Sequence, residues 1–151
     1  MHMNFVRDRS SGYLTNWAAR LFARAIDRRL TKLGVNSAYM PVFFALANGE
    51  SLSQTALANL ASVEQPTMAA TLKRMDRDGL IARSPDPADG RSALVSLTPV
   101  AKKKLRGVQA AGHEVNDVAF SGLTAKEQAQ YLDLLRRVIA SLESDSDPSK
   151  L

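Results

Sequence analysis

The sequence of 151 residues contains no cysteine and two histidines. The absence of cysteine excludes disulfide bridges, thiolate metal ligands, a cysteine nucleophile and thiol-based redox sensing. Two histidines are too few for a histidine-rich metal site, so we expect no metal and no other cofactor. Aromatic residues make up 6% of the chain, but apolar residues make up 45%, which favours a globular protein over a disordered one.

The sequence also lacks a long hydrophobic run. The longest one, residues 38–47, contains Pro41 and is about half the ~20 residues needed to cross a bilayer. Residues 1–12 are polar and charged, without the apolar stretch typical of a signal peptide. We therefore expect a cytoplasmic protein with no membrane partner.

The charge is unevenly distributed along the chain. The 20 basic and 15 acidic residues give a net charge of +5 at pH 7. Residues 66–106 contain nine basic and four acidic residues, whereas residues 107–151 contain four basic and seven acidic ones. This pattern favours a localised polyanion-binding surface over a chain that coats an acidic membrane uniformly.

Hydrophobic periodicity predicts a mainly α-helical chain. Apolar residues recur at spacings of three and four in segments that are separated by glycine, turn or capping residues. Thr124 and Glu127 have the spacing of a capping box. The polar tail, residues 144–151, is predicted to be flexible. The predicted helices cover residues 13–33, 37–47, 54–60, 64–78, 99–120 and 124–143.

Residues 53–97 have the order helix, short turn, helix and hairpin, which predicts a winged helix-turn-helix. Residues 80–83 and 93–97 are short β-type runs, and the turn residues 84–91 between them predict a hairpin wing. A B-DNA major groove is about 12 Å wide and admits one α-helix, so the second helix can present side chains to base edges. The predicted fold class is therefore mainly α with a small β-hairpin wing.

The helix predicted over residues 64–78 has an apolar stripe and a polar face. We expect the stripe, Val63, Met68, Leu72 and Met75, to be buried. On the polar face, Gln65 and Thr67 can reach base edges, and basic residues can bind phosphates. A solvated helix face is the alternative interpretation, which the helix-turn-helix context disfavours. The residues expected to face DNA are Gln65, Pro66, Thr67, Ala69, Ala70, Lys73, Arg74 and Arg77.

Asp89 and Arg91 lie two residues apart at the predicted tip of the wing. A carboxylate at this spacing can fix the direction of the guanidinium group. The arginine would then enter the minor groove, where a narrow A·T tract concentrates negative potential. On spacing alone, an exposed ion pair worth ~0–1 kcal/mol is the simpler interpretation.

Five short segments share a pattern with a known family, and these are residues 57–58, 67–75, 79–83, 89–91 and 97–98. Together they resemble the MarR family (multiple antibiotic resistance regulators). The resemblance covers almost the whole chain, and its most specific part is the wing with its Asp-x-Arg pattern. It implies a bacterial or archaeal homodimeric transcription regulator that binds a pseudo-palindromic operator with half-sites about 10 bp apart.

The resemblance also implies a division of labour along the chain. Residues 36–98 would form the DNA-binding lobe, in which Asp89 orients Arg91 in the minor groove, and the helices within 13–33 and 99–143 would dimerise. Against the family pattern, Ala101 stands where glycine is common, and Ala69 and Ala70 stand where polar or basic residues are frequent. Specificity is then expected to depend more on DNA shape and on Arg91. The residues expected at the dimer interface are Leu14, Leu21, Phe120, Leu132, Leu135, Ile139 and Leu142.

A further implication of the resemblance is a small aromatic effector that releases the protein from DNA. Pockets for such ligands are mostly apolar with a few polar groups. Core packing is the stronger interpretation for the individual aromatic residues, and a surface or interface position is the stronger one for the histidine. The candidate pocket residues are Tyr13, Trp17, Tyr39, Met40, Phe43 and His113.

Two other functions remain as alternatives. A winged-helix module used only for protein–protein assembly is disfavoured, because the basic segment 66–106 coincides with the predicted DNA-facing elements. An enzyme is disfavoured because the sequence has no glycine-rich phosphate loop, no Ser/His/Asp arrangement and no metal-ligand spacing.

Overall fold

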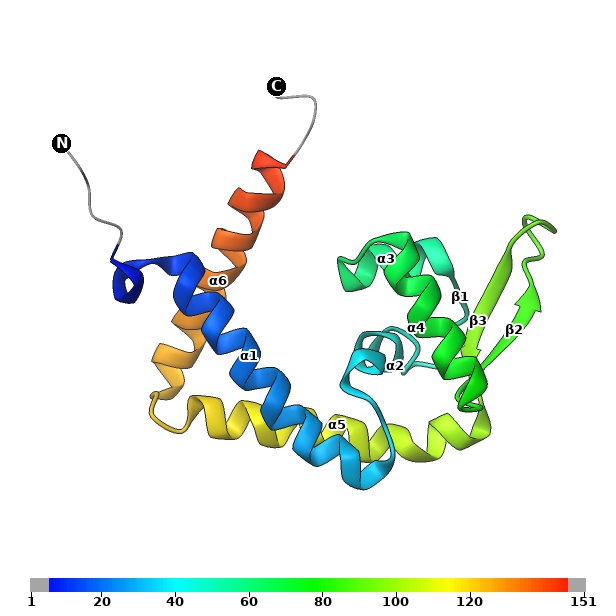
Figure 1. The fold of residues 1–151 in the computed structure, drawn as a ribbon, viewed down its shortest axis with the longest axis horizontal. Coiled ribbons are helices and arrows are strands. Elements are labelled where there is room, and N and C mark those ends of the chain that lie inside the picture. Colours follow the sequence, from blue (N-terminus) through cyan, green and yellow to red (C-terminus); the bar gives the residue numbers. More distant parts are fainter. Residues whose placement is uncertain (1–5, 147–151) are drawn as a thin grey trace. The chain divides into compact units, whose positions relative to one another are not determined.

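The computed structural model describes residues 6–146 (Figure 1). It divides into two compact units between Val115 and Asn116. The predicted fold class is confirmed, because the chain is mostly helical with one small antiparallel sheet. In order, the elements are a 3-10 helix Arg7–Arg9, α1 Ser11–Leu30, 3-10 helices Thr31–Leu33 and Ser37–Tyr39, α2 Met40–Ala45, β1 Leu52–Ser53, α3 Gln54–Ala61, α4 Gln65–Arg77, β2 Ile81–Pro85, β3 Ala93–Leu97, α5 Pro99–Phe120 and α6 Ala125–Asp145.

Capping residues set most helix boundaries. The Ser10 side chain accepts a hydrogen bond from the Tyr13 amide, so α1 begins two residues before its predicted start. Gly34 ends the 3-10 turn after α1 with a left-handed φ of 66°, as predicted. The α6 helix extends to Asp145, so the predicted tail is helical at its beginning, and residues 147–151 lie outside the described residues.

The sheet has the strand order β1-β3-β2, with both pairs antiparallel. The predicted hairpin is confirmed, with Ile81 opposite Leu97 and Pro85 opposite Ala93. The sequence did not predict β1, which pairs Leu52 with Val95. This short strand brings the start of α3 to the sheet beside the wing.

The core of the first unit joins α1, α2, α3, α4, the sheet and α5. The central part of the predicted α4 stripe is confirmed, because Met68, Leu72 and Met75 are buried together with Leu57 of α3. Val63, which was expected in this stripe, is 37% exposed. It precedes the N-cap residue of α4 and so does not follow the helical period of that helix.

The C-terminal end of α1 is joined to α5 by polar and packing contacts. Lys104 Nζ donates a hydrogen bond to the Leu33 carbonyl at 2.6 Å, and Arg29 pairs with Glu114 at 3.0 Å. Gly107 lies against Leu33, because a Cβ atom at this position would be 3.0 Å from Leu33 Cδ1. The Lys104 ammonium group therefore helps to hold the end of α1 against α5.

The second unit contains the end of α5 and α6. The predicted capping box is confirmed, with Thr124 accepting from the Glu127 amide and Glu127 accepting from the Thr124 amide. The Phe120 and Tyr131 rings pack edge to face at 5.8 Å. Within residues 6–146, no helix combines the length and hydropathy needed to cross a bilayer.

Candidate nucleic-acid interface

The turn between α3 and α4 is closed by the backbone. Ser62 ends α3 in the left-handed region, with φ 52°, and is the one non-glycine residue with positive φ among residues 6–146. The amide of Val63 donates to the Ala58 carbonyl at 3.0 Å, and the amide of Ser62 donates to the Asn59 carbonyl at 3.2 Å. These bonds fix the direction in which α4 leaves α3.

The two sides of α4 differ sharply in burial. Met68, Thr71, Leu72 and Met75 are buried, and Ala69 is half-buried. Thr71 was not anticipated in the stripe, but its position completes the helical spacing. The structure places the other predicted DNA-facing residues on the exposed side, and these are Gln65, Pro66, Thr67, Ala70, Lys73, Arg74 and Arg77.

At the N-terminal end of α4, one side-chain hydrogen bond to another helix is found among residues 6–146. The N-cap residue of α4, Glu64, makes no side-chain hydrogen bond to the helix amides within the described residues. Gln65 is the first residue of α4, and its Oε1 accepts a hydrogen bond from Nε2 of Gln54 at 3.2 Å. Gln54 was not among the predicted site residues. It lies eleven residues before Gln65, and this spacing gives no sign that the two side chains meet.

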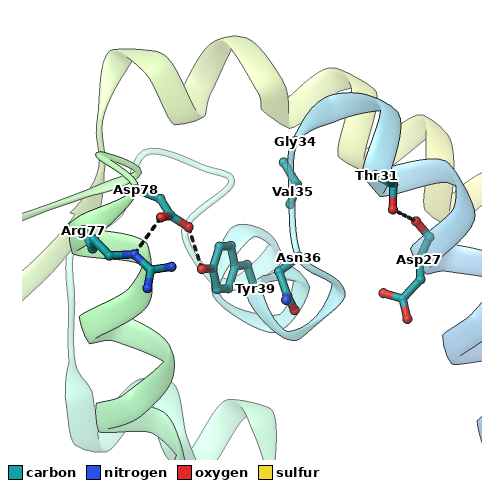
Figure 2. A pocket seen from close by; sticks show the side chains of 8 residues that line it. All are labelled: Asp27, Thr31, Gly34, Val35, Asn36, Tyr39, Arg77 and Asp78. Carbon is teal, nitrogen blue, oxygen red and sulfur yellow. Dashed lines mark hydrogen bonds and ion pairs between the residues drawn. The ribbon is translucent and has the colours of Figure 1, made fainter.

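The C-terminal end of α4 is tied to the core through Asp78. Its Oδ2 accepts a hydrogen bond from the buried Tyr39 hydroxyl at 2.7 Å, and its Oδ1 accepts one from Arg77 Nε at 3.1 Å (Figure 2). These bonds, from Tyr39 and then from Arg77, lower the pKa of the Asp78 carboxyl. Burial, followed by the bond to Asp78, raises the pKa of Tyr39, and the bond to Asp78 raises the pKa of Arg77.

A second contact joins the end of α4 to the start of α5. The Thr98 hydroxyl donates to the Gly79 carbonyl at 2.7 Å and accepts from the Ala101 amide at 3.3 Å. Thr98 thus caps the start of α5 and also satisfies a carbonyl just beyond α4. Ala101, at the position where the family resemblance would place glycine, is fully buried.

A cavity of about 370 Å³ lies between the C-terminal ends of α1 and α4 (Figure 2). Its lining is mostly polar and includes both members of the Tyr39–Asp78 hydrogen bond and the Arg77 guanidinium group. The lining residues are Asp27, Thr31, Gly34, Val35, Asn36, Tyr39, Arg77 and Asp78.

The tip of the wing differs from the sequence-based expectation. Asp89 Oδ1 accepts a hydrogen bond from the backbone amide of Arg91 at 3.0 Å, and no Asp89–Arg91 ion pair occurs among residues 6–146. Asp86 makes the same kind of turn with the Ala88 amide at 2.9 Å. The carboxylate therefore orders the backbone of the tip, and the Arg91 side chain is exposed.

The candidate effector residues occupy both buried and exposed positions. Phe43 and Tyr39 are buried in the core, and Met40 packs against it. The rings of Tyr13 and Trp17 pack edge to face at 6.3 Å on α1, where Trp17 is exposed. His113 is exposed. Of the six, Tyr39 lines the cavity of Figure 2.

The expected dimerisation residues include several exposed apolar side chains. Leu14 and Leu21 are exposed on α1, and Leu132, Ile139 and Leu142 are exposed on α6. Phe120 and Leu135 are half-buried within the second unit. Among residues 6–146 no group of three or more His, Asp or Glu side chains is placed to bind a metal ion.

Comparisons with known proteins agree with this architecture. A MarR-family model matches residues 33–92. The transcriptional regulator HosA of Escherichia coli is 33% identical over 98 residues, which are 65% of this chain and 73% of HosA. The HTH-type transcriptional repressor IacR of Pseudomonas putida is 30% identical over 132 residues, which are 85% of this chain and 78% of IacR.

The fold is also found in solved structures. A crystal structure of mutant Escherichia coli MarR complexed with operator DNA superposes with a TM-score of 0.78 and 25% identity, covering 84% of this chain and 91% of that chain. The family-model match, the identity to HosA over most of its length and the shared winged-helix fold show that this chain belongs to the MarR family of transcriptional regulators, which are not enzymes.

Proposed function

We propose that this regulator acts as a homodimeric repressor, with α4 in the major groove of a pseudo-palindromic operator and the wing in the minor groove. The observation that carries the proposal is the two-sided character of α4. One side is buried in the core, and the other presents polar residues at its N-terminal end and three exposed basic residues toward its C-terminal end.

Each of the predicted DNA-facing residues of α4 has a role in this arrangement. Gln65 and Thr67 hydrogen-bond to base edges, while Pro66, Ala69 and Ala70 contact apolar groups such as the thymine methyl. The basic residues, Lys73, Arg74 and Arg77, bind phosphates and set the position of the helix.

The wing supplies a separate contact. Arg91 enters the minor groove, where negative potential is concentrated in narrow A·T tracts. Asp89 acts through the backbone, because its hydrogen bond to the Arg91 amide holds the tip in one turn conformation. The guanidinium group remains free to adapt to the groove.

Dimerisation follows from the exposed apolar residues outside the lobe formed by residues 36–98. In this proposal α1, α5 and α6 carry the interface, including Leu14, Leu21, Leu132, Ile139 and Leu142. A second protomer would remove these side chains from water, at about 25 cal/mol per Å² of apolar surface. Phe120 and Leu135 support this surface from within the second unit.

A small aromatic effector is proposed to relieve repression. Tyr39 lines a cavity of about 370 Å³, which is within the size range of small-ligand sites, and its mostly polar lining suits the polar groups of an effector rather than its ring. The lining contains Arg77 together with the carboxylates of Asp27 and Asp78, so an effector that holds the Arg77 guanidinium would compete with DNA phosphate for it. Tyr13, Trp17, Met40, Phe43 and His113 remain candidates for contacts with the ring. An effector found by screening small aromatic compounds with polar substituents should lower operator affinity in the unmodified protein and less in Arg77→Ala.

Selection of bound sequences from random DNA at physiological salt tests the main proposal. The expected product is a pseudo-palindrome with half-sites about 10 bp apart. Binding should weaken as salt increases, and Arg74→Ala should reduce the slope of log K against log salt by about 1. Arg136→Ala on α6 is the matched control and should leave the slope unchanged. Absence of sequence enrichment, or affinity independent of salt, would overturn the proposal in favour of a protein–protein module.

A further inference from the structure

The exposed surface at the start of the helix-turn-helix contains a pair of glutamines. Gln54 is the first residue of α3 and Gln65 is the first residue of α4. Nε2 of Gln54 donates to Oε1 of Gln65 at 3.2 Å. Gln54 is half-buried and Gln65 is exposed, so the inner glutamine supports the outer one.

The position of Gln54 is itself fixed by its neighbour in the chain. Ser53 caps α3 by accepting a hydrogen bond from the Ala56 amide at 3.2 Å, and it pairs with Leu94 in the sheet. Because the backbone of residue 53 is held by both a helix cap and a strand, the Gln54 side chain starts from a defined point. In the structure it is the Nε2 end of its amide, the donor, that faces α4.

This contact matters because a glutamine amide has two different ends. A free side chain can rotate to present either its oxygen, an acceptor, or its NH2 group, a donor. When the oxygen is directed at α3 by Gln54, the NH2 group of Gln65 is the end left for another partner. Bidentate recognition of adenine requires both amide atoms to face one base, and this geometry disfavours it.

We propose that Gln54 is a specificity-determining residue that holds Gln65 with its NH2 group directed toward the DNA. The proposal rests on the placement of α4 in the major groove that is proposed above. Gln65 then reads acceptors at a base edge, so guanine, with O6 and N7, is preferred to cytosine, which offers only its N4 donor.

Because of the composition of α4, the Gln54–Gln65 pair is expected to account for much of the hydrogen bonding to base edges. Ala69 and Ala70 cannot donate or accept side-chain hydrogen bonds, and Pro66 has no backbone N–H. Near the N-terminal end of the helix, Thr67 is the other uncharged hydrogen-bonding side chain on the exposed face. A change in the orientation of one amide should therefore change the sequence that is selected.

The experiment measures base preference for the unmodified protein and for four variants by selection from random DNA, with competition binding at the selected site. Gln65→Ala identifies the operator position that Gln65 reads, because preference there should disappear. Gln54→Lys, which can only donate, keeps the Gln65 oxygen engaged and is the matched control. Gln54→Glu can only accept, so it should turn the Gln65 NH2 group toward residue 54 and away from DNA. Gln54→Met makes no hydrogen bond and should leave the Gln65 amide free to rotate.

The expected preference for guanine over cytosine at that position is about three- to tenfold, as expected for one base-edge hydrogen bond. Gln54→Lys should keep this ratio, Gln54→Glu should reverse it toward cytosine or adenine, and Gln54→Met should reduce it to within about twofold. The ratio is taken within each variant, so the uniform effect of added charge on affinity cancels.

Two results would overturn the inference. One is an unchanged ratio in both Gln54→Glu and Gln54→Met, and the other is a Gln65→Ala variant that keeps the preference of the unmodified protein at every position. Either result leaves the proposed regulator function intact, since the unmodified protein still selects an operator. If the unmodified protein selects no sequence, the proposed function itself fails, and the inference fails with it.

Discussion

The two ends of α4 are held in different ways. At the C-terminal end, Asp78 joins the buried Tyr39 hydroxyl to the guanidinium group of Arg77. At the N-terminal end, the side chain of Gln65 accepts a hydrogen bond from the side chain of Gln54 on α3. Gln65 itself is exposed. The helix is thus anchored to the core where basic residues would bind phosphates, and its polar side chains are left accessible where bases would be read.

The largest effect is expected at the centre of α4, on which both ends depend. Leu72 is 0% exposed, so Leu72→Ala should lower the free energy of unfolding by about 2–5 kcal/mol through lost burial and a residual cavity. Leu60→Ala on α3 is the matched control, because Leu60 is 66% exposed, and it should change stability by less than about 0.5 kcal/mol. Denaturant unfolding at one protein concentration measures both. Equal losses would mean that Leu60 is buried in the assembled protein.

The anchor at the C-terminal end should have a smaller effect with a characteristic pH dependence. Tyr39→Phe removes a buried donor and should lower the free energy of unfolding near neutral pH by about 1 kcal/mol. The pKa of Asp78 is lowered in the folded state, so its contribution is present above its ordinary pKa and is lost as pH falls through the folded value.

Thermal unfolding of both proteins as a function of pH checks this prediction. The difference between them should begin to shrink as pH falls below about 4, the ordinary pKa of an aspartate, and should keep shrinking until the pH is below the lowered pKa of folded Asp78. The pKa of Tyr39 is raised, so its contribution is present below about pH 10 and is lost as pH rises through the folded value. A difference that stays constant from pH 3 to pH 11 would show that the hydroxyl acts by packing alone.

Local signals explain why many boundaries were predictable. The α5 helix has its predicted limits, Pro99–Phe120, because Thr98 caps it and Ser121-Gly122 ends it. The capping box of α6 is equally local. Each of these features depends on residues within a few positions of one another, so the sequence alone contains the information.

Features that depend on distant residues were not predictable in this way. The choice of buried face on α3 is one of them: it is centred on Leu57 and Ala58, and Leu60 points roughly 110° away from it at 100° per residue. The β1 strand exists because of its pairing with β3, and the Tyr39–Asp78 bond joins residues 39 positions apart. These features depend on packing and pairing between distant parts of the chain, so they cannot be predicted from the spacing of neighbouring residues.

The wing allows a test of how a carboxylate orders a DNA contact. Asp89 bonds to the Arg91 amide, and an asparagine oxygen can accept the same bond. Asp89→Asn should therefore keep operator affinity within about twofold, whereas Asp89→Ala should lower it about two- to tenfold by loosening the tip. Titration with the selected operator measures both variants. If Asp89→Asn weakens binding as much as Asp89→Ala, the charge of Asp89 acts on the guanidinium group, as its sequence spacing first suggested.

The smallest effect is expected from Glu64, the N-cap residue of α4. Its carboxylate lies at the N-cap without a side-chain bond to the helix amides within residues 6–146, and in the proposed complex it would face DNA phosphates. Glu64→Gln should raise operator affinity about twofold at low salt, and this gain should vanish at high salt because the repulsion is screened. The same change should cost a few tenths of a kcal/mol in stability, since a negative charge favours a helix N-terminus.

Glu143→Gln on α6 makes the same charge change far along the chain from the proposed interface and should leave affinity unaltered. An equal gain in both variants would mean that net charge alone governs binding, and that the start of α4 has no special proximity to DNA.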